Sequence, residues 1–346
     1  MCYFEVMLRA AITAFLLTLL VALPGEAQRR YRAEPDPQSP AGIPYQRYFT
    51  RDKYNRRITF YVSGNPRERL PLVTVVLGSG AFSNFRREGE RIVDAHGTVR
   101  QAFAAKAHVV VVEKPGVAFL EQPAHGNGDD FPGSISGSAE FQRESALPRW
   151  VEAVSAALQA ARRLPQADPK RILIIGHSEG ALVAAMVAAE NSFVTHVASL
   201  AGNGPSVLFE LMHKAREGRL YASLANDPEK QMAQIEADIA AVHADPLSTT
   251  RQAVGHSHIY WSSRWPHSTI DALSRTRSRI FIAHGTADRN VSIENFDLMY
   301  AQLLASAQDI KAMRVEGADH GFRIAADGMR DVWGDVIGKL RNWFLE

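Results

Sequence analysis

The chain has 346 residues, of which 46% are hydrophobic and 22% are charged, and its formal net charge is +2. This composition is typical of a folded globular protein and excludes global disorder. The nearly balanced charge, with no basic stripe along the sequence, gives no reason to expect a nucleic-acid partner or an anionic membrane surface. The length fits one large α/β domain with an insertion as well as it fits two domains.

The N-terminus has the pattern of a secretory signal peptide. Arg9 precedes an apolar stretch over residues 10–23, and a small-residue site, Gly25-Glu26-Ala27, follows it, which is the order that export signals require. The stretch is shorter than the ~20 apolar residues that cross a bilayer comfortably. We therefore expect cleavage after Ala27, a secreted or periplasmic protein and no stable membrane insertion after cleavage. An uncleaved anchor is the alternative.

The segment after the predicted signal differs from the rest of the chain. Residues 28–44 are basic, Pro-rich and without periodicity, which predicts a flexible N-terminal segment. The only cysteine, Cys2, lies inside the predicted signal peptide, so the mature chain would contain no disulfide. We expect the folded domain over residues 45–346.

From residue 45 onwards, short β-branched runs alternate with longer helical patterns. The predicted strands are RRITFYVSG (56–64), LVTVVLGSG (72–80), HVVVVEKPG (108–116), RILIIG (171–176), THVASLAG (195–202), RSRIFIAHG (277–285) and AMRVEG (312–317). The predicted helices are RIVDAHGTVRQAFAAKA (91–107), LPRWVEAVSAALQAARRLP (147–165), ALVAAMVAAE (181–190), IENFDLMYAQLLASA (293–307) and DVWGDVIGKLRNWF (331–344). This alternation predicts an α/β fold with a mostly parallel sheet flanked by helices.

One long segment interrupts the alternation. Residues 203–276 contain helical patterns, such as PEKQMAQIEADIAAVHAD (228–245), but no convincing strand. An insertion of this kind in an α/β domain predicts a helical cap over the strand ends, which would shape a substrate pocket. A second irregular stretch, residues 120–145, follows a strand and is expected to add a wall to the same crevice.

The sequence GHSEG (176–180) fits the GxSxG turn, in which a serine projects from a sharp strand-to-helix connection. By composition alone this pattern would occur about one time in ten in a chain of this length. The strand before it and the helix after it make it more specific. Ser178 is therefore the predicted nucleophile, and the backbone N–H of Glu179, at the start of a helix, is a predicted donor to an oxyanion.

A serine needs a base to accept its proton, and the base needs an acceptor to orient it. Two later strand ends supply these groups, since Asp288 follows one strand and His320 follows the next. Asp319 is a rival for the acid, but adjacent loop side chains usually diverge, which favours Asp288. His177 lies inside the turn, where its side chain would point away from the serine hydroxyl and pack beneath the turn.

The motifs GHSEG, HGTADRNV (284–291) and ADHGF (318–322) make the chain similar to the α/β hydrolase superfamily, over about residues 45–344. It looks most like the branch with dienelactone-hydrolase-like and serine-aminopeptidase-like proteins. The resemblance implies the α/β hydrolase fold with a helical cap, the triad Ser178, Asp288 and His320, and a structural role for His284, where this family often has a His-Gly pair.

The resemblance also implies a second oxyanion donor in the loop GSGAFSNF (78–85). Where the family commonly has His-Gly, this chain has Leu77-Gly78, which keeps the backbone but removes a side chain that often braces the loop. The donor is therefore the backbone N–H of Ser79 or of Gly80, and the sequence leaves both open.

The sequence GHSHIYWSSRWPH (255–267) gathers three histidines with aromatic residues. No carboxylate or cysteine accompanies the histidines at ligand spacing, so we expect no metal site. Pocket lining or ordinary packing is the expected use of these residues, and the predicted chemistry needs no cofactor.

Together these patterns predict an exported serine hydrolase that cleaves a carboxylic ester, or a related thioester or amide, of a small-molecule acyl substrate. A serine peptidase or an acyltransferase would use the same residues. Esterase is favoured over peptidase because no residue provides an obvious anchor for a peptide terminus. A non-enzymatic binding module on the same fold is the remaining alternative, and it is disfavoured because every catalytic role has a candidate residue.

Overall fold

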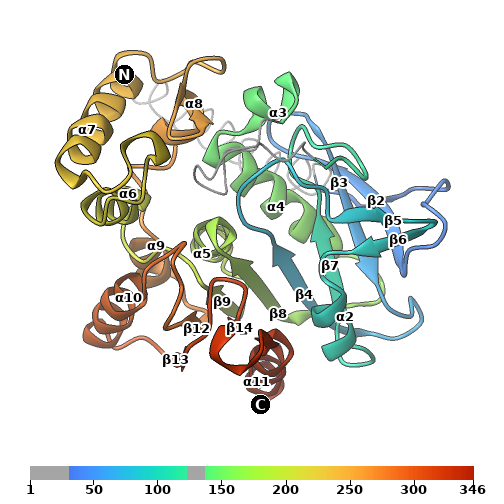
Figure 1. The fold of residues 1–346 in the computed structure, drawn as a ribbon. Coiled ribbons are helices and arrows are strands. Elements are labelled where there is room, and N and C mark those ends of the chain that lie inside the picture. The colour runs from blue at the N-terminus through green and yellow to red at the C-terminus, as the bar shows by residue number, and fades with distance from the viewer. Residues whose placement is uncertain (1–30, 123–136) are drawn as a thin grey trace, which may run out of the picture.

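The computed structural model describes residues 31–122 and 137–346. The predicted signal peptide and the middle of the irregular stretch 120–145 lie outside the described residues. The described chain forms a central sheet with helices on both faces and a separate group of helices at one side (Figure 1). The predicted architecture, a mostly parallel sheet flanked by helices, is confirmed.

The sheet is parallel over its greater part and antiparallel at its N-terminal edge. Its described strands are, in spatial order, β1 (Glu34–Pro35), β2 (Tyr45–Arg51), β3 (Arg57–Ser63), β7 (His108–Val112), β4 (Leu70–Val76), β8 (Ala167–His177), β9 (His196–Leu200), β12 (Arg279–Gly285) and β13 (Ile310–Val315). Every residue of β7 and β9 is buried, as expected for strands covered on both faces.

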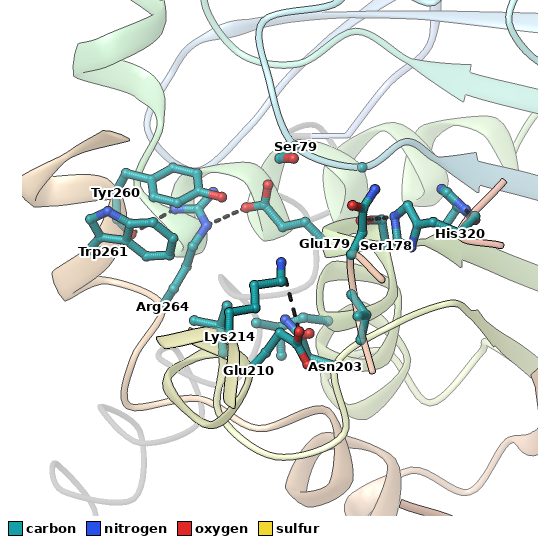
Figure 2. Close-up of a pocket in the computed structure, with 16 residues that line it drawn as sticks. Ser79, Ser178, Glu179, Asn203, Glu210, Lys214, Tyr260, Trp261, Arg264 and His320 are labelled. Carbon is teal, nitrogen blue, oxygen red and sulfur yellow. Dashed lines mark hydrogen bonds and ion pairs between the residues drawn. The ribbon is translucent and has the colours of Figure 1, made fainter. Parts of the chain in front are cut away.

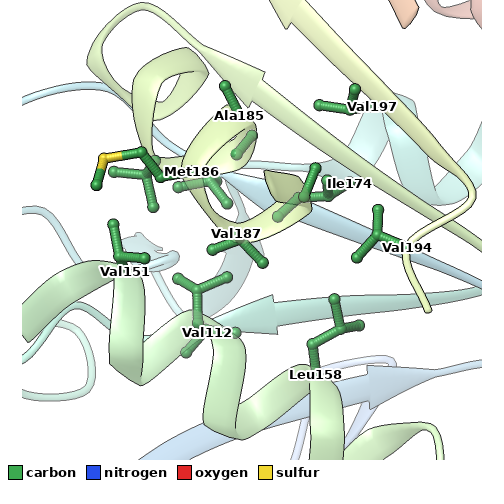
Figure 3. Packing of buried hydrophobic residues seen from close by; sticks show 14 of the residues in the cluster. Val112, Val151, Leu158, Ile174, Ala185, Met186, Val187, Val194 and Val197 are labelled. Atoms are coloured by element: carbon green, nitrogen blue, oxygen red, sulfur yellow. The ribbon is translucent and has the colours of Figure 1, made fainter. Parts of the chain in front are cut away.

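Two hydrophobic clusters hold the helices to the two faces of the sheet. Figure 3 shows part of the larger cluster, in which Val151 and Leu158 of one helix meet Met186 and Val187 of another. One face carries α4 (Leu147–Ala161), α5 (Glu179–Glu190), α9 (Thr269–Arg275) and α10 (Ile293–Ala305), and the other carries α2 (Gly97–Ala102) and α11 (Trp333–Leu345).

The segment between β9 and β12 forms the cap. Its elements before α9 are α6 (Val207–Arg216), η1 (Ala222–Leu224), α7 (Pro228–Ala244), β10 (Gln252–Ala253), β11 (His256–Ser257) and α8 (His258–Ser262). Figure 1 shows α6, α7 and α8 grouped together beside the sheet domain. They enclose a hydrophobic cluster of their own, which includes Leu211, Ile235 and Trp261.

Two local predictions were wrong. Residues 91–107 do not form one helix, because β6 (Arg91–Asp94) pairs with β5 (Phe85–Glu88) as a hairpin before α2 begins; the β-branched Ile92 and Val93 favour the strand. The segment 28–44 is not wholly flexible, because β1 pairs with β2 and the Asp36 carboxylate accepts a hydrogen bond from Arg47. An edge strand tolerates Pro35, which has no N–H to donate.

The smaller described elements lie in connections. They are α3 (Ala139–Glu144), before α4, and the pair β14 (Arg323–Ile324) and β15 (Arg330–Asp331) with η2 (Ala325–Asp327) between them. Among residues 31–122 and 137–346, no helix combines the length and apolar character needed to cross a bilayer.

Candidate active site

Three side chains from different strand ends meet at one edge of the sheet. Ser178 follows β8, Asp288 follows β12 and His320 follows β13, and the carboxyl ends of these parallel strands lie side by side. The Nε2 atom of His320 lies 3.0 Å from Ser178 Oγ, and its Nδ1 atom lies 2.8 Å from Asp288 Oδ2. The structure thus brings the three predicted residues into one hydrogen-bonded series, with the imidazole in the middle.

The turn at Ser178 has the geometry that the GxSxG pattern requires. Ser178 has φ 57° and ψ −127°, a conformation that costs on the order of 1–3 kcal/mol for a residue with a side chain. A Cβ atom on Gly176 would lie 2.1 Å from the carbonyl oxygen of Gly180, and one on Gly180 would lie 2.3 Å from that of Val76. Only glycine fits at either position, which is why the strand and helix can approach so closely.

The Asp288 side chain is fully buried, and donors surround its carboxylate. Its Oδ1 atom accepts hydrogen bonds from the backbone N–H groups of Asn290 (2.8 Å) and Val291 (2.9 Å), and His284 Nε2 lies 3.2 Å from Oδ2. Burial raises the pKa of Asp288, but the hydrogen bonds from His284 and His320 outweigh it and hold this pKa well below its usual range. Asp288 is therefore an anion at neutral pH and can orient His320.

Asp319, the rival acid, does not contact the imidazole of His320. Its Oδ1 atom accepts hydrogen bonds from the backbone N–H groups of Gly321 (2.9 Å) and Arg323 (2.8 Å). The Asp319 carboxylate therefore stabilises the turn that carries His320. The side chain of His320 itself points toward Asp288.

His177 has a second contact that the sequence did not reveal. Its ring packs against Trp333, as expected beneath the turn, and its Nε2 atom donates to the carbonyl oxygen of His320 at 3.0 Å. Removal from water lowers the pKa of His177 to about 4, and the nearby His320 ring adds to this effect. A neutral His177 therefore holds the backbone of the residue that contacts Ser178.

A cavity of about 230 Å³ opens between the strand ends and the cap. Figure 2 shows Ser178, Glu179 and His320 on the sheet side, with Lys214, Tyr260 and Arg264 of the cap opposite them. Gly78 and Ser79 also line this cavity, whereas Gly80 lines a smaller one behind them. Of the two candidates for the second oxyanion donor, Ser79 thus faces the space beside Ser178.

An ion pair and a hydrogen bond connect the cap to the sheet domain. The Arg264 guanidinium contacts the Glu179 carboxylate and also donates to the carbonyl oxygen of Ser145 at 2.7 Å. Burial raises the pKa of Glu179, but the charges of Arg264 and Lys114 outweigh it, so the net shift is downward. The Glu179 side chain is therefore an anion that is already neutralised by a cation of the cap.

A second charged pair lies on α6. The Glu210 carboxylate accepts hydrogen bonds from Ser292 N–H (2.9 Å) and the Asn295 side chain (2.7 Å), and Lys214 Nζ lies 3.8 Å from its other oxygen. Burial lowers the pKa of Lys214 to about 8, although Glu210 opposes this shift.

The histidine-rich segment of the cap contributes mainly to packing. His256 stacks on Tyr260 with 3.8 Å between ring centroids, and Trp261 and Trp265 stack beside them. Within residues 31–122 and 137–346, no cluster of histidine, cysteine, aspartate or glutamate side chains could hold a metal ion. Tyr260 and Trp261 reach the cavity, so the segment provides both packing and pocket lining.

Lys114, just after β7, is a site residue that the sequence analysis missed. It is 6% exposed, and its Nζ atom donates to the carbonyl oxygens of Gly78 and Gly80, the latter at 2.6 Å. A signal was present, because HVVVVEKPG places a lysine directly at the carboxyl end of a buried strand. Charged residues at such a position lie on the same rim as the nucleophile.

The sequence matches the model of the alpha/beta hydrolase family over residues 125–332. This match covers more than half of the 346 residues, and the chain belongs to that family. It is an enzyme of the α/β hydrolase type. Among proteins with curated functions, none matches the sequence significantly.

Several solved structures share the fold at low sequence identity. Est1E from Butyrivibrio proteoclasticus has a TM-score of 0.51 and 15% identity, with 86% of this chain and 98% of that chain covered. Pyrococcus horikoshii acylaminoacyl peptidase has a TM-score of 0.55 and 11% identity, with 87% and 41% covered. Porphyromonas gingivalis dipeptidyl peptidase 4 has a TM-score of 0.53 and 15% identity, with 88% and 36% covered. This chain therefore spans less than half the length of either peptidase.

Proposed function

We propose that this hydrolase cleaves carboxylic esters, or related thioesters or amides, through a covalent acyl-enzyme on Ser178. The observation that carries the proposal is the hydrogen-bonded series from Ser178 through His320 to Asp288. A nucleophile, a base within reach and an acceptor that orients the base are the parts required for this chemistry.

In the proposed reaction, Ser178 Oγ attacks the carbonyl carbon of the substrate while its proton passes to His320 Nε2. The C=O π pair moves to the oxygen, and Asp288 stabilises the imidazolium that results. When the tetrahedral intermediate collapses, His320 returns the proton to the leaving alcohol and the acyl group stays on Ser178. Water then attacks the acyl group on Ser178 with the same proton transfers through His320, which releases the acid and restores the serine hydroxyl.

The oxyanion of the intermediate needs hydrogen-bond donors beside Ser178. The backbone N–H of Glu179 is suited to this role because it is in the first turn of α5, where free N–H groups and the helix dipole favour negative charge. The second donor comes from the loop at Ser79 and Gly80, which precedes β5.

Ester substrates are favoured over peptides by the state of the acidic residues. A peptidase that removes residues from an amino terminus needs an anion to bind the ammonium group, and Glu179 and Glu210 both line the cavity. Each carboxylate is instead paired with a cation of the cap, Glu179 with Arg264 and Glu210 with Lys214. A peptidase or an acyltransferase would nevertheless use the same three residues, so substrate trials must include both.

The test is labelling with a fluorophosphonate probe, which reacts with an activated serine. We expect the wild type to be labelled and Ser178→Ala to remain unlabelled while folded. Chromogenic esters of increasing acyl length, together with aminoacyl anilides, then rank the substrates, and we expect the esters to be faster. A folded wild type that is not labelled would rule out the serine mechanism.

We also propose that the enzyme is exported, on the strength of the signal pattern in residues 1–27. Expression of the full chain followed by mass spectrometry of the mature protein tests this. A mature N-terminus at Gln28 in the periplasmic or secreted fraction is expected, and an intact N-terminus in the cytoplasmic fraction would contradict it.

A further inference from the structure

The loop beside the nucleophile is held by a buried lysine. Lys114 Nζ donates to two carbonyl oxygens of the loop, those of Gly78 and Gly80, and it lies 4.6 Å from the centroid of the Trp150 ring. A charged donor makes the stronger kind of hydrogen bond, and here two backbone acceptors share one ammonium group. The direction in which these two carbonyl groups point is thereby fixed.

The direction of one carbonyl determines that of the next N–H. The carbonyl of Gly78 and the N–H of Ser79 belong to one trans peptide group, so they point in opposite directions. Because the carbonyl points at Lys114, the Ser79 N–H points away from it. Lys114 lies beside the smaller cavity behind the loop, and Ser79 lies on the cavity that contains Ser178.

The loop is close enough to the nucleophile for this direction to matter. A Cβ atom added to Gly78 would lie 3.0 Å from Ser178 Cβ and 3.4 Å from its Oγ atom. Within the described residues, no hydrogen bond uses the N–H of Ser79 or that of Glu179. Two N–H groups without a protein acceptor thus flank the hydroxyl that would attack a carbonyl.

We propose that Lys114 is a positioning residue that aims the Ser79 N–H, rather than that of Gly80, at the oxyanion. The inference rests on the proposed serine mechanism. It assigns Lys114 the bracing of the part of the loop beside Ser178, because the side chain of Leu77 cannot donate a hydrogen bond. Lys114 itself does not contact the substrate.

The next residue in the chain provides a matched control. Glu113 holds the far half of the same loop, since its carboxylate accepts hydrogen bonds from Ser83 Oγ (3.0 Å) and from the backbone N–H of Asn84 (3.1 Å). Both residues are buried and both anchor the loop, but Glu113 does not contact the residues beside Ser178. A comparison of variants at Lys114 and Glu113 therefore separates two effects, the orientation of the Ser79 N–H and the overall stability of the loop.

The experiment measures kcat and KM for a p-nitrophenyl ester, and Ki for a trifluoromethyl ketone. Ser178 adds to this ketone to form a hemiketal oxyanion, so its Ki reports the donors directly. For Lys114→Met we expect kcat to fall roughly 100-fold, as when one oxyanion donor is lost, with Ki raised by a similar factor and KM changed much less. Lys114→Gln, which keeps a donor, should fall between Lys114→Met and the wild type.

Glu113→Gln should lower the melting temperature while it leaves kcat and Ki within about twofold of the wild type. Equal losses of kcat and Ki affinity in the Glu113 and Lys114 variants would contradict the inference, as would a Lys114→Met enzyme with wild-type values. A wild type that is neither labelled nor active contradicts the proposed function itself and this inference with it. The wild-type measurement distinguishes this last result from the other two, which are read from the variants.

The alkaline limb of the pH profile is a readout that does not depend on the Met variant folding. Burial lowers the pKa of Lys114 to about 8, although Glu179 opposes this shift. A neutral amine holds the two carbonyls less firmly, so wild-type kcat should fall as pH rises through about 8. Lys114→Gln should lack this fall, and an identical alkaline limb in both enzymes would count against the proposal. The charged or titratable groups around Lys114 are Glu179, Arg264, Glu113 and His256.

Discussion

At the scale of single residues, the site depends on which carboxylate contacts the imidazole. Asp288 is buried and lies 2.8 Å from His320 Nδ1, whereas Asp319 bonds to the backbone of its own turn. We predict that Asp288→Asn lowers kcat by about 10⁴-fold, because an amide favours the wrong tautomer of the histidine. Asp319→Asn should retain most of the activity. Steady-state kinetics of the two variants decides between them, and the reverse order would transfer the role to Asp319.

His177 contributes a hydrogen bond as well as packing. Its Nε2–H donates to the carbonyl oxygen of His320, so His177→Phe keeps a ring at this place and removes only the donor. A net hydrogen bond contributes about 1 kcal/mol, and we predict a fall in kcat of roughly fivefold with little change in KM. Trp333→Phe is the control, because Trp333 packs on the same ring and donates nothing to His320. Similar kinetics for both variants would reduce His177 to packing.

At the scale of elements, the connection between β8 and α5 depends on two glycines. We predict that Gly180→Ala prevents folding or removes activity, because its Cβ would collide with the carbonyl oxygen of Val76 in β4. Gly338→Ala is the matched control in α11, where a Cβ meets nothing within 4 Å. Alanine is favoured over glycine by up to about 1 kcal/mol inside a helix. Thermal unfolding should therefore show a stabilised Gly338 variant, and a folded, active Gly180 variant would refute the steric argument.

The contact of Glu179 in α5 with Arg264, just after α8, gives a prediction with a defined pH dependence. Arg264→Met leaves the Glu179 carboxylate, whose side chain is 12% exposed, without its principal cation, which costs about 3–5 kcal/mol at neutral pH. The pKa of Glu179 is lowered in the folded enzyme. The ion pair therefore stabilises the fold at pH values above the pKa that Glu179 has in the unfolded chain, and this stabilisation is lost as the pH falls through the folded-state pKa. The difference in the free energy of unfolding between the wild type and Arg264→Met, measured by denaturant unfolding, should therefore become smaller toward acidic pH. A deficit that does not change with pH would contradict this explanation.

The sequence was most informative where an element follows a periodic pattern and where a motif is local. The strands of the parallel sheet, the helices α4, α5 and α10 and the turn at Ser178 all follow from such patterns. Lys114 and Arg264 were missed because their roles depend on where a long side chain ends. The carbonyls that Lys114 contacts are far from Lys114 in sequence. Likewise, Glu179 is far in sequence from its partner Arg264. Residues 91–94 were misjudged because a hairpin partner, Phe85–Glu88, outweighed the helical pattern.

At the scale of the whole molecule, stability comes from apolar packing without covalent cross-links. The chain has one cysteine, Cys2, so no disulfide can form within it. We predict that the melting temperature of the purified enzyme is the same with and without a thiol reductant. Differential scanning calorimetry measures this, and a reductant-dependent shift would indicate a cross-link between chains.

The cap has a hydrophobic cluster that shares no residue with the two clusters of the sheet. Side-chain contacts such as those of Arg264 with Glu179, and of Glu210 with Ser292, join it to the rest of the described molecule. Substitutions inside the cap can therefore accumulate without disturbing the edge that carries Ser178. A directed-evolution library confined to residues 207–262, with Glu210 held constant and Arg264 outside the library, should change substrate range and leave the rate of fluorophosphonate labelling nearly constant. Substrate selectivity and the reactivity of Ser178 can thus evolve independently of each other in this enzyme.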